Sequence, residues 1–382
     1  MTSDMTERLA FEAEWFDSNA DLIKKFYLYF YTSDCTIELF DIKNKKTFLR
    51  RTKCENVDFK DFFVGNVVTI FSRAMKLVDV ADSATKNKIG KIMEKTFAIL
   101  KPDVINKMGE IIKTITAHDL HIANIMMVTL SEQDVDMLYE NNENIKFIKS
   151  YLTSGPSVLL TLLGNNAVTV WQDLMGSIYN SDGEKNNEST SLRARYGSDN
   201  IHDGFYGSLN SQLAEKELDI FFPTMKSAKK HFKNTATCKK CTCCVIKPHA
   251  VRARLTGNII DDIQKAGFII SAIKQFHVDP INAAEFLEVY KGVLANYGAM
   301  VGELQSGPCI AMEIIHKDTD VNVQAEFRKL CGPMDPDIGV KVRPQTLRAK
   351  YGKDKIQNAI HCSDIPEDGI LEVEYFFKIL DE

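Results

Sequence analysis

The stretch NAIHCSD, residues 358–364, closes a segment that occurs twice in this 382-residue chain. The later copy of that segment, TLRAKYGKDKIQNAIHCS (346–363), aligns with SLRARYGSDNIHDGFYGS (191–208). In this alignment His361 stands where the earlier copy has Tyr206. One copy has therefore kept a reactive imidazole, whereas the other carries a phenol.

Further repeated segments lie upstream and set the size of the repeating unit. They pair TFAILKPDVINKMGEII (96–112) with CCVIKPHAVRARLTGNII (243–260), and SGPSVLLTL (154–162) with SGPCIAMEI (306–314). The offset is 247 − 101 = 146 between the two lysines and 361 − 206 = 155 between the Tyr and His positions. A nearly constant shift indicates a duplicated domain of roughly 130–150 residues, which is an ordinary domain size.

The composition is typical of an ordinary globular protein, with 45% apolar and 26% charged residues. A net charge of −5 argues against a surface that coats nucleic acid. Apolar runs stay shorter than the ~18 residues that a membrane span needs, and the N-terminus is acidic early, unlike a signal peptide. Nine cysteines in a chain of this size predict a reducing compartment. We expect no nucleic acid and no membrane among the partners.

Four cysteines, Cys238, Cys241, Cys243 and Cys244, resemble half of a zinc site. A tetrahedral structural site needs four converging ligands, usually from two separated pairs. However, Cys243 and Cys244 lie in the predicted first strand of the later repeat, where successive side chains point to opposite faces. No partner pair such as HxxxH or CxxC occurs elsewhere in the sequence. We interpret these cysteines as strand core and linker thiols, and we expect no protein-bound metal.

The repeats divide the chain into an N-terminal module at 1–91, a first repeat at 92–222, a linker at 223–240 and a second repeat at 241–382. The module is rich in aromatic and β-branched residues between short turn-like segments, which predicts strands. These strands are expected at 26–31, 36–41, 46–51 and 67–71. They indicate a small β-sandwich or a partly closed barrel. Because no cluster has catalytic spacing, the module is interpreted as a binding or docking domain.

Each repeat begins with a short apolar strand, followed by Lys-Pro and an amphipathic helix. In the later copy the apolar residues recur at near-helical spacing and a glycine follows them: Ile259, Ile260, Ile263, Ala266, Gly267 and Phe268. Strands at 269–278 and 309–315 flank a further expected helix at 282–294. This order is typical of the split-βαβ arrangement. The predicted fold class is therefore α+β, with a small β-rich module and two ferredoxin-like (βαββαβ) domains.

The linker is polar and basic, and its lysines are Lys226, Lys229, Lys230, Lys233, Lys239 and Lys240. A solvated tether explains such a composition. The more specific alternative is a contact to an acidic polymer surface, which salt would weaken. Both interpretations stay open at this point.

The combination of Lys247, Arg328, Arg348 and His361 suits phosphoryl transfer. That reaction needs cations on the non-bridging oxygens and a positioned nucleophile. Arginine binds phosphate through a bidentate fork, and lysine acts as a point charge. An imidazole would carry the phosphoryl group as a labile phosphoramidate, which gives a two-step exchange with ping-pong kinetics. A carboxylate such as Glu372 would fix the imidazole tautomer.

Both repeats resemble nucleoside diphosphate kinase domains, on the NxxHxSD segment, the KPD element at 101–103 and the SGP turns. The N-terminal module resembles the DM10 type, which axonemal proteins share. That second resemblance depends on Trp15, FLRRT at 48–52 and DFFVGNVVTIFSRAMKLVDVAD at 61–82. Together the two resemblances cover almost the whole chain.

For the second domain the resemblance implies that His361 is the phosphorylated nucleophile, oriented by Glu372. Asn358 and Ser363 would belong to its supporting segment. Phosphate contacts are implied for Lys247, Tyr290, Arg328 and Arg348, and base stacking for Tyr297, which every base permits. The implied cofactors are ATP and nucleoside diphosphates, with Mg²⁺ carried by the nucleotide.

One position of the second domain departs from the family pattern. Met334 stands where the family usually has a phosphate-contacting threonine. The missing hydrogen bond to a charged group is worth roughly 1.5–3 kcal/mol. We therefore expect an activity one to two orders of magnitude below that of a complete site.

The first domain departs much further. Lys101, Arg193, Ser208 and Glu217 match the family, but Tyr206 replaces the nucleophile, Asp203 the asparagine and Gln172 one arginine. A phenol with a pKa of about 10 is mostly protonated at neutral pH, and a carboxylate at 203 repels phosphate. His202 lies four residues earlier in the motif and is expected on a different part of the loop. A nucleotide-binding role and a scaffold role stay open for this domain.

Two functions therefore follow from the resemblance. In the first, the C-terminal domain transfers the γ-phosphoryl group of ATP to nucleoside diphosphates through phospho-His361, within a ciliary, microtubule-associated protein. In the second, the chain is a purely structural microtubule-associated protein with vestigial kinase activity. The implied partners are nucleotides, tubulin and other axonemal doublet-microtubule proteins, and the implied locations are cytoplasm, cytoskeleton, cilium axoneme and basal body. Because a tandem chain can pair its own domains, we expect a monomer with an internal pseudo-dimer.

Overall fold

The structure, a computed structural model, describes residues 8–381 except 18, 19, 21, 55, 56, 58, 65, 90–93, 140–142, 178–189 and 224–231. The chain forms two compact units. One comprises Met1–Met93 with His277–Cys309, and the other comprises Glu94–Phe276 with Ile310–Glu382.

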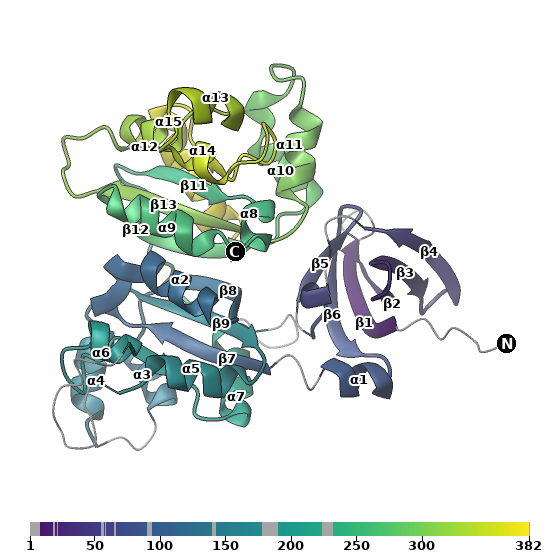
Figure 1. Cartoon of the computed structure of the whole chain (residues 1–382), viewed down its shortest axis with the longest axis horizontal. Helices are drawn as coiled ribbons and strands as arrows, with labels where there is room; N and C mark the ends of the chain where they lie inside the picture. The colour runs from purple at the N-terminus through teal and green to yellow at the C-terminus, as the bar shows by residue number, and fades with distance from the viewer. Residues whose placement is uncertain are drawn as a thin grey trace. The chain divides into compact units, whose positions relative to one another are not determined.

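The N-terminal module is one antiparallel six-stranded sheet with the order β4-β3-β2-β1-β6-β5 (Figure 1). Its strands are β1 (Arg8–Asp17), β2 (Leu22–Tyr31), β3 (Thr36–Asp41), β4 (Lys46–Lys53), β5 (Val67–Ile70) and β6 (Arg73–Val80). A 3₁₀ turn (Phe59–Asp61) and helix α1 (Ser83–Ile89) complete it. The four predicted strands are present, but β1 and β6 were not predicted. In β1 buried Phe11 and Ala13 alternate with Glu12 and Glu14, and this alternation is the signal that was overlooked.

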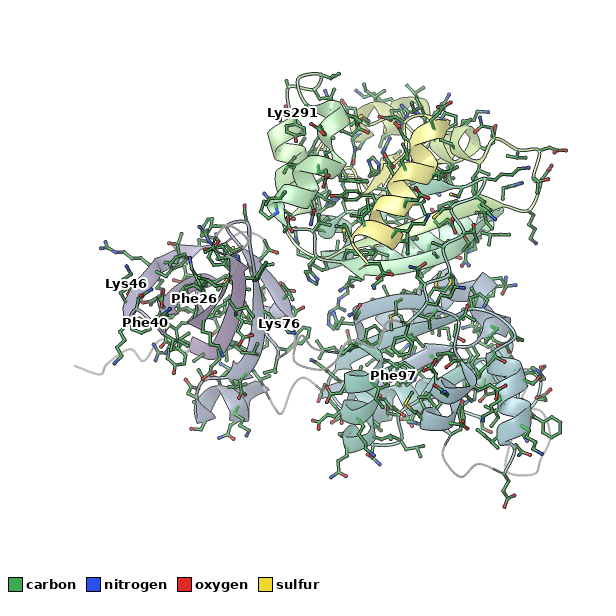
Figure 2. The ribbon with its side chains drawn as sticks, turned by 180° about the vertical axis from the view of Figure 1, so that it is seen from behind. Phe26, Phe40, Lys46, Lys76, Phe97 and Lys291 are labelled. Carbon is green, nitrogen blue, oxygen red and sulfur yellow. The ribbon has the colours of Figure 1, made fainter. Side chains whose placement is uncertain are left out.

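Aromatic side chains fill the hydrophobic core of the module. Phe26 of β2, labelled in Figure 2, is completely buried. The rings of Phe30 and Phe62 stack with their centroids 4.1 Å apart. Such offset stacking adds to the free energy that burial of the rings provides. The module therefore has a hydrophobic core of its own.

The segment 277–309 contains α10 (Pro280–Phe286), a 3₁₀ turn η3 (Glu288–Tyr290) and α11 (Tyr297–Leu304). Asp279 caps α10 by accepting hydrogen bonds from the backbone N–H groups of Ile281 and Asn282. The helix predicted at 282–294 is present only up to Phe286, where α10 ends, and the prediction is wrong for the rest of that range. Gly292 adopts a φ of +77°, which a helix does not contain.

The second unit is built on one eight-stranded sheet, with the order β10-β7-β9-β8-β12-β13-β11-β14. The first repeat contributes β7 (Glu94–Leu100), β8 (His121–Val128), β9 (Ser157–Gly164) and β10 (Phe205–Gly207). The second contributes β11 (Thr242–Ile246), β12 (Phe268–Phe276), β13 (Cys309–His316) and β14 (Ile360–Cys362). Within each repeat the third strand lies between the first and the second, and the fourth lies outside the first. This ferredoxin-like order confirms the predicted fold class.

Helices accompany the strands of both repeats. The first repeat has η2 (Pro102–Lys107), α2 (Met108–Ala117), α3 (Glu132–Leu138), α4 (Ile145–Leu152), α5 (Ala167–Met175), α6 (Leu192–Tyr196) and α7 (Ser211–Phe221). The second has α8 (Pro248–Arg252), α9 (Thr256–Lys265), α12 (Val323–Cys331), α13 (Pro336–Val342), α14 (Leu347–Tyr351), α15 (Pro366–Glu374) and a π-helical turn (Tyr375–Ile379). Phe97 of β7, labelled in Figure 2, is completely buried, and its ring stacks on that of Phe221 of α7 with the centroids 4.8 Å apart.

The two repeats are joined by strand pairing and by helix packing. Strand β12 pairs with β8 through Lys274 and Met126, and α2 packs against α9 (Figure 1). Gln264 of α9 reaches across, because its side chain accepts from the Gly109 N–H at 2.9 Å and donates to the Ile105 carbonyl at 2.8 Å. Lys113 forms an ion pair with Asp261 at 2.8 Å. The expected pairing of the two repeats within one chain is thus observed.

The linker enters the second unit along the sheet. Asn234 bridges to Val128 and donates to the Phe377 carbonyl. Buried Glu313 accepts from the backbone N–H groups of Thr237 and Cys238. Lys226, Lys229 and Lys230, on which much of the linker interpretation depended, lie outside the described residues.

The cysteines near the linker lie where the sequence placed them. Cys243 and Cys244 are buried in β11, Cys241 is buried just before it, and Cys238 is partly exposed. The described residues contain no group of three or more His, Cys, Asp or Glu side chains that could hold a metal ion.

In the described part of the chain, no helix has the length and apolar character required to cross a membrane.

The joint between the repeats depends on glycine at positions 109 and 257. A Cβ on Gly109 would lie 2.2 Å from the Asp261 nitrogen, and one on Gly257 would lie 2.7 Å from the Lys113 nitrogen. Both contacts are to backbone atoms, which cannot rotate away. Larger residues at these positions would therefore separate α2 from α9.

We expect Gly109→Val to lower the free energy of unfolding by about 1–3 kcal/mol, because overpacking at a tight contact forces the backbone to move. Denaturant unfolding monitored by circular dichroism measures this change. Gly302→Ala in α11 is the matched control, since a Cβ there meets nothing within 4 Å. Equal stability of Gly109→Val and wild type would show that the helices separate without cost.

Candidate functional site

The register between β11 and β14 places the nucleophile candidate. The two strands pair antiparallel, with Val245 opposite His361 and Ile246 opposite Ile360. One residue further, the Lys247 N–H donates to the Ala359 carbonyl at 2.9 Å. All five residues of β11 are buried, so this strand lies in the core and is held on both edges. Residues distant in sequence, Lys247 and His361, are therefore neighbours.

A carboxylate holds the ring of His361. Nε2 of His361 lies 2.9 Å from Glu372 Oε2, and the Ser363 hydroxyl donates to the same oxygen at 2.7 Å. The ring is only 7% exposed. A carboxylate oxygen can only accept, so Nε2 carries the proton and the imidazole lone pair lies on Nδ1. In this tautomer Nδ1 is the nucleophilic atom.

The environment of His361 also changes its acidity. Burial by itself lowers the pKa of the imidazole, since it disfavours the cation. The Glu372 carboxylate and its hydrogen bond act in the opposite direction and dominate, so the net effect raises the pKa of His361. The positive charge of Lys247 partly offsets this increase.

Three cationic side chains surround the nucleophile strand. Lys247 is 8% exposed, and its Nζ donates to the Ile356 carbonyl at 2.9 Å. Arg348 is 6% exposed and donates to the carbonyls of Ile360 at 3.3 Å and Gly332 at 2.9 Å. The third cation, Arg328 of α12, donates to both the backbone and the side chain of Asp364. A buried arginine held by carbonyls, as Arg348 is, keeps its orientation, which suits bidentate binding of phosphate oxygens.

Asn358 lies at the start of the turn before His361 and is 1% exposed. Its side-chain N–H group donates to the backbone carbonyl of Met334 at 3.0 Å. Among the described residues, its Oδ1 has no hydrogen-bond partner although it is buried. Asn358 therefore links the segment just before α13 to the turn that precedes His361.

Sequence reasoning missed two contributors to this site. Gln324 of α12 donates to the carbonyls of Ser363 and Asp364, both at 2.8 Å, and so holds the segment after the nucleophile. Cys362 lies beside His361 and contacts Arg348 Nη2 at 3.5 Å. A hydrogen bond from Cys331, with Arg348 and His361 nearby, lowers the pKa of Cys362 to about 6. The cysteine inside NAIHCSD was a visible signal, whereas nothing in the sequence marked Gln324.

The two predicted tyrosines belong to a different part of the structure. Tyr290 is in η3 and is 9% exposed, and Tyr297 begins α11 with its hydroxyl donating to the Ala284 carbonyl at 2.9 Å. Both lie within His277–Cys309, which belongs to the first compact unit. Their assignment to the phosphate and the base stays a prediction.

Comparison with known proteins assigns the chain to a family. The family profile described as nucleoside diphosphate kinase matches residues 94–227 and 240–381, and the profile described as DM10 domain matches 1–85. The chain belongs to the nucleoside diphosphate kinase family. It is 43% identical over 381 residues to nucleoside diphosphate kinase homolog 7 of Rattus norvegicus, covering 99% of this chain and 95% of that protein. The Mus musculus protein of the same name is 42% identical over the same length.

A solved nucleoside diphosphate kinase from Aquifex aeolicus is also similar. It is 33% identical, with a TM-score of 0.34, and the match covers 37% of this chain and 96% of that one.

The first nucleoside diphosphate kinase domain repeats the carboxylate arrangement around a different side chain. Glu217 of α7 accepts from the hydroxyls of both Tyr206 and Ser208, as Glu372 does from His361 and Ser363. Burial and the nearby Glu217 carboxylate raise the pKa of Tyr206 well above its usual range. The phenol is therefore a weaker nucleophile here than in water.

The cations of the first domain are already paired with a carboxylate. Asp203 forms ion pairs with Lys101 and, at 2.9 Å, with Arg193. Gln172, at the position of Arg328, donates to the carbonyls of Gly207 and Ser208 at 3.2 and 2.9 Å. The Asp203 carboxylate is thus already paired with Lys101 and Arg193, the two cations that phosphate oxygens would need.

His202 does not replace the missing nucleophile. Its Nδ1 lies 2.9 Å from Asp199, and its ring packs edge-on against Tyr151. The expectation that His202 lies on a different part of the loop from Tyr206 agrees with these separate partners.

We expect Tyr206→His, made in a His361→Ala chain, to acquire no phosphate from ATP. Asp203 would still neutralise Lys101 and Arg193, and no arginine stands at position 172. Acid-labile, alkali-stable ³²P on the protein measures the outcome. Adding Asp203→Asn and Gln172→Arg is the matched comparison, and label is expected only there. Strong labelling of the first variant would show that these two positions matter little.

Proposed function

We propose that the second nucleoside diphosphate kinase domain transfers the γ-phosphoryl group of ATP to nucleoside diphosphates through phospho-His361. The supporting observation is the contact between His361 Nε2 and Glu372 at 2.9 Å, next to Lys247, Arg328 and Arg348. This arrangement supplies an oriented nucleophile and the cations that phosphoryl transfer requires. Mg²⁺ enters as part of the substrate, bound to the nucleotide.

The reaction has two matched displacements. Nδ1 of His361 attacks the γ-phosphorus, an N–P bond forms, the β–γ bridging P–O bond breaks, and the nucleoside diphosphate leaves. After exchange, a terminal β-phosphate oxygen of a second nucleoside diphosphate attacks the same phosphorus and breaks the N–P bond. The free imidazole is regenerated, so atoms and charge balance over the cycle. Such an exchange is ping-pong.

The residues around His361 contribute orientation and charge. Glu372 and Ser363 fix the ring, so that Nδ1 does not have to reorient before attack. As the N–P bond forms, positive charge develops on the imidazole, and the Glu372 carboxylate stabilises it. Lys247 and Arg348 stabilise the charge on the oxygens of the transferred group. Because both cations are buried and held by carbonyls, they need no rearrangement during the reaction.

Met334 limits this activity. Its backbone carbonyl accepts from Asn358, but its side chain has no hydroxyl to offer to a phosphate. The proposed enzyme therefore works with one hydrogen bond fewer than the usual family site.

We propose in addition that the protein is a ciliary, microtubule-associated component with tubulin and other doublet-microtubule proteins as partners. The support is the DM10 match at residues 1–85, a module type that axonemal proteins share. The neutralised first domain also favours a scaffold role for at least half of the tandem. A mainly structural protein with weak kinase activity is the second candidate function.

For the catalytic proposal, the full-length chain incubated with γ-³²P-ATP and Mg²⁺ should acquire acid-labile, alkali-stable phosphate. His361→Ala should acquire none, because the nucleophile is absent. Rapid quenching and phosphate analysis measure the label. A folded wild-type chain without label, or equal label in both proteins, would remove the enzymatic function.

The pH dependence of labelling tests the role of Glu372. The neutral imidazole is the nucleophile, so labelling slows as pH falls through the raised pKa of His361. In Glu372→Gln the carboxylate charge is lost, the pKa of His361 falls, and the decline should move to lower pH. An unchanged profile would mean that Glu372 does not set the protonation of His361.

For the docking proposal, full-length protein should co-sediment with axonemal doublet microtubules. His361→Ala should co-sediment equally, because docking does not use the nucleophile. Gel densitometry of pellet and supernatant fractions measures the bound share. A protein that stays entirely in the supernatant would contradict the docking function and leave the kinase function intact.

A further inference from the structure

A buried histidine outside the predicted site contacts the turn that carries His361. His249, the second residue of α8, is only 3% exposed. Its Nε2 accepts a hydrogen bond from the backbone N–H of Ala359 at 3.2 Å. A ring nitrogen that accepts cannot carry a proton, so His249 is neutral and protonated on Nδ1.

Ala359 needs such support because of its backbone conformation. Its φ is +70°, in the left-handed region that residues with a Cβ rarely adopt. The Ile360 N–H donates to the Asn358 carbonyl at 2.9 Å, which closes a three-residue turn around Ala359. His361 follows two residues later. Any relaxation of Ala359 toward negative φ would therefore rotate the start of β14 and move the nucleophile.

The turn is fastened on both sides to the segment after β11. The Ala359 carbonyl accepts from the Lys247 N–H at 2.9 Å, and the Ala359 N–H donates to His249. The first of these bonds also occurs in the first repeat, where the Lys101 N–H donates to the Gly204 carbonyl at 2.9 Å. The second is specific to the repeat that has the nucleophile, within the hydrogen bonds that the described residues show.

The first repeat forms the corresponding turn with different residues. Gly204, at the position of Ala359, has a φ of +77°, which glycine adopts without a steric penalty. Asp103, at the position of His249, accepts instead from the Tyr151 hydroxyl. A Cβ on Gly204 would lie 2.7 Å from Val104 Cγ1, whereas the second repeat has the smaller Ala250 there. Alanine in the turn therefore occurs together with space for its methyl group and with a histidine that binds its N–H.

We propose that His249 is a positioning residue, which holds Ala359 in its left-handed turn and thereby sets the place of His361. The proposal rests on the phosphotransfer function proposed above. In this role His249 acts on the nucleophile only through its hydrogen bond with the Ala359 N–H. The alternative is that His249 is a core histidine that contributes only to stability.

Single-turnover labelling of the full chain with γ-³²P-ATP separates these roles. His249→Phe keeps the ring volume but has no acceptor, and we expect it to label about 10- to 100-fold more slowly, as a nucleophile displaced by about 1 Å does. His249→Gln places an acceptor oxygen near the position of Nε2 and should label at close to the wild-type rate. Thermal unfolding of each variant reports the share that is folded. Equal rates for folded His249→Phe and wild type would overturn the proposal.

A suppressor variant gives a readout that a stabilising role would not produce. Glycine takes the left-handed conformation without help, as Gly204 does. Ala359→Gly added to His249→Phe should therefore recover much of the lost labelling rate. Absence of any recovery in a folded double variant would overturn the positioning role and favour simple core packing.

Amide hydrogen exchange distinguishes this proposal from the function on which it rests. Exchange in the segment 355–362 should be faster in His249→Phe than in wild type and in His249→Gln, whether or not the protein labels. If wild type fails to label but shows this difference, the kinase function fails and the anchoring of the turn stands. Unchanged exchange in His249→Phe would overturn the anchoring itself.

Discussion

The antiparallel pairing of β11 with β14 is the constraint on which the candidate site depends. It places His361 opposite Val245 and brings Lys247, two residues after Val245, next to the turn at Ala359. A one-residue slip in this register would turn every side chain of β14 to the other face of the sheet. Such a slip would be costly, because Ile360 and Cys362 on either side of His361 belong to the hydrophobic core. The cations and Glu372 then assemble around a nucleophile whose position is already set.

The two repeats show how one backbone accommodates two sets of side chains. Gly207 has no room for a Cβ, because Trp171 and Met175 fill the space. The second repeat has Cys362 at that position and the smaller Phe327 and Cys331 where the first has Trp171 and Met175, and Cys331 hydrogen-bonds to Cys362. Substitution in the motif is therefore matched by substitution in the helix beneath it. Close packing requires this match, since interiors contain few voids and tolerate little overpacking.

The cationic side chains of the two repeats have different partners. Lys101 and Arg193 both form ion pairs with Asp203, which lies within the same site. In the second repeat backbone carbonyls hold Lys247 and Arg348, and Arg328 forms an ion pair with Asp364. Carbonyl dipoles compensate only part of the cost of burying a cation. The two repeats therefore differ in how their cations are held, by one carboxylate in the first repeat and by backbone carbonyls and Asp364 in the second.

Much of this organisation could be read from the sequence, because it is carried by local patterns. The duplication, the β-rich module and the ferredoxin-like class follow from repeated segments and from hydrophobic periodicity. The nucleophile motif and its tyrosine-containing copy are contiguous and needed no fold to be seen. Strand β1 was overlooked although Phe11 and Ala13 alternate with Glu12 and Glu14, and the helix expected at 282–294 ends at Phe286 and does not continue through Gly292, whose φ is +77°.

Contacts between distant residues were decided only by the tertiary structure. That Gln324 holds the loop after His361, that Asp203 neutralises Lys101, and that His249 binds the Ala359 N–H all depend on how strands and helices meet in space. A hydrogen bond requires a donor and an acceptor within about 3.5 Å, and sequence spacing does not encode that distance for residues a hundred positions apart. The sequence by itself determined which chemical groups the chain carries and which segments repeat; the fold determined which of those groups meet.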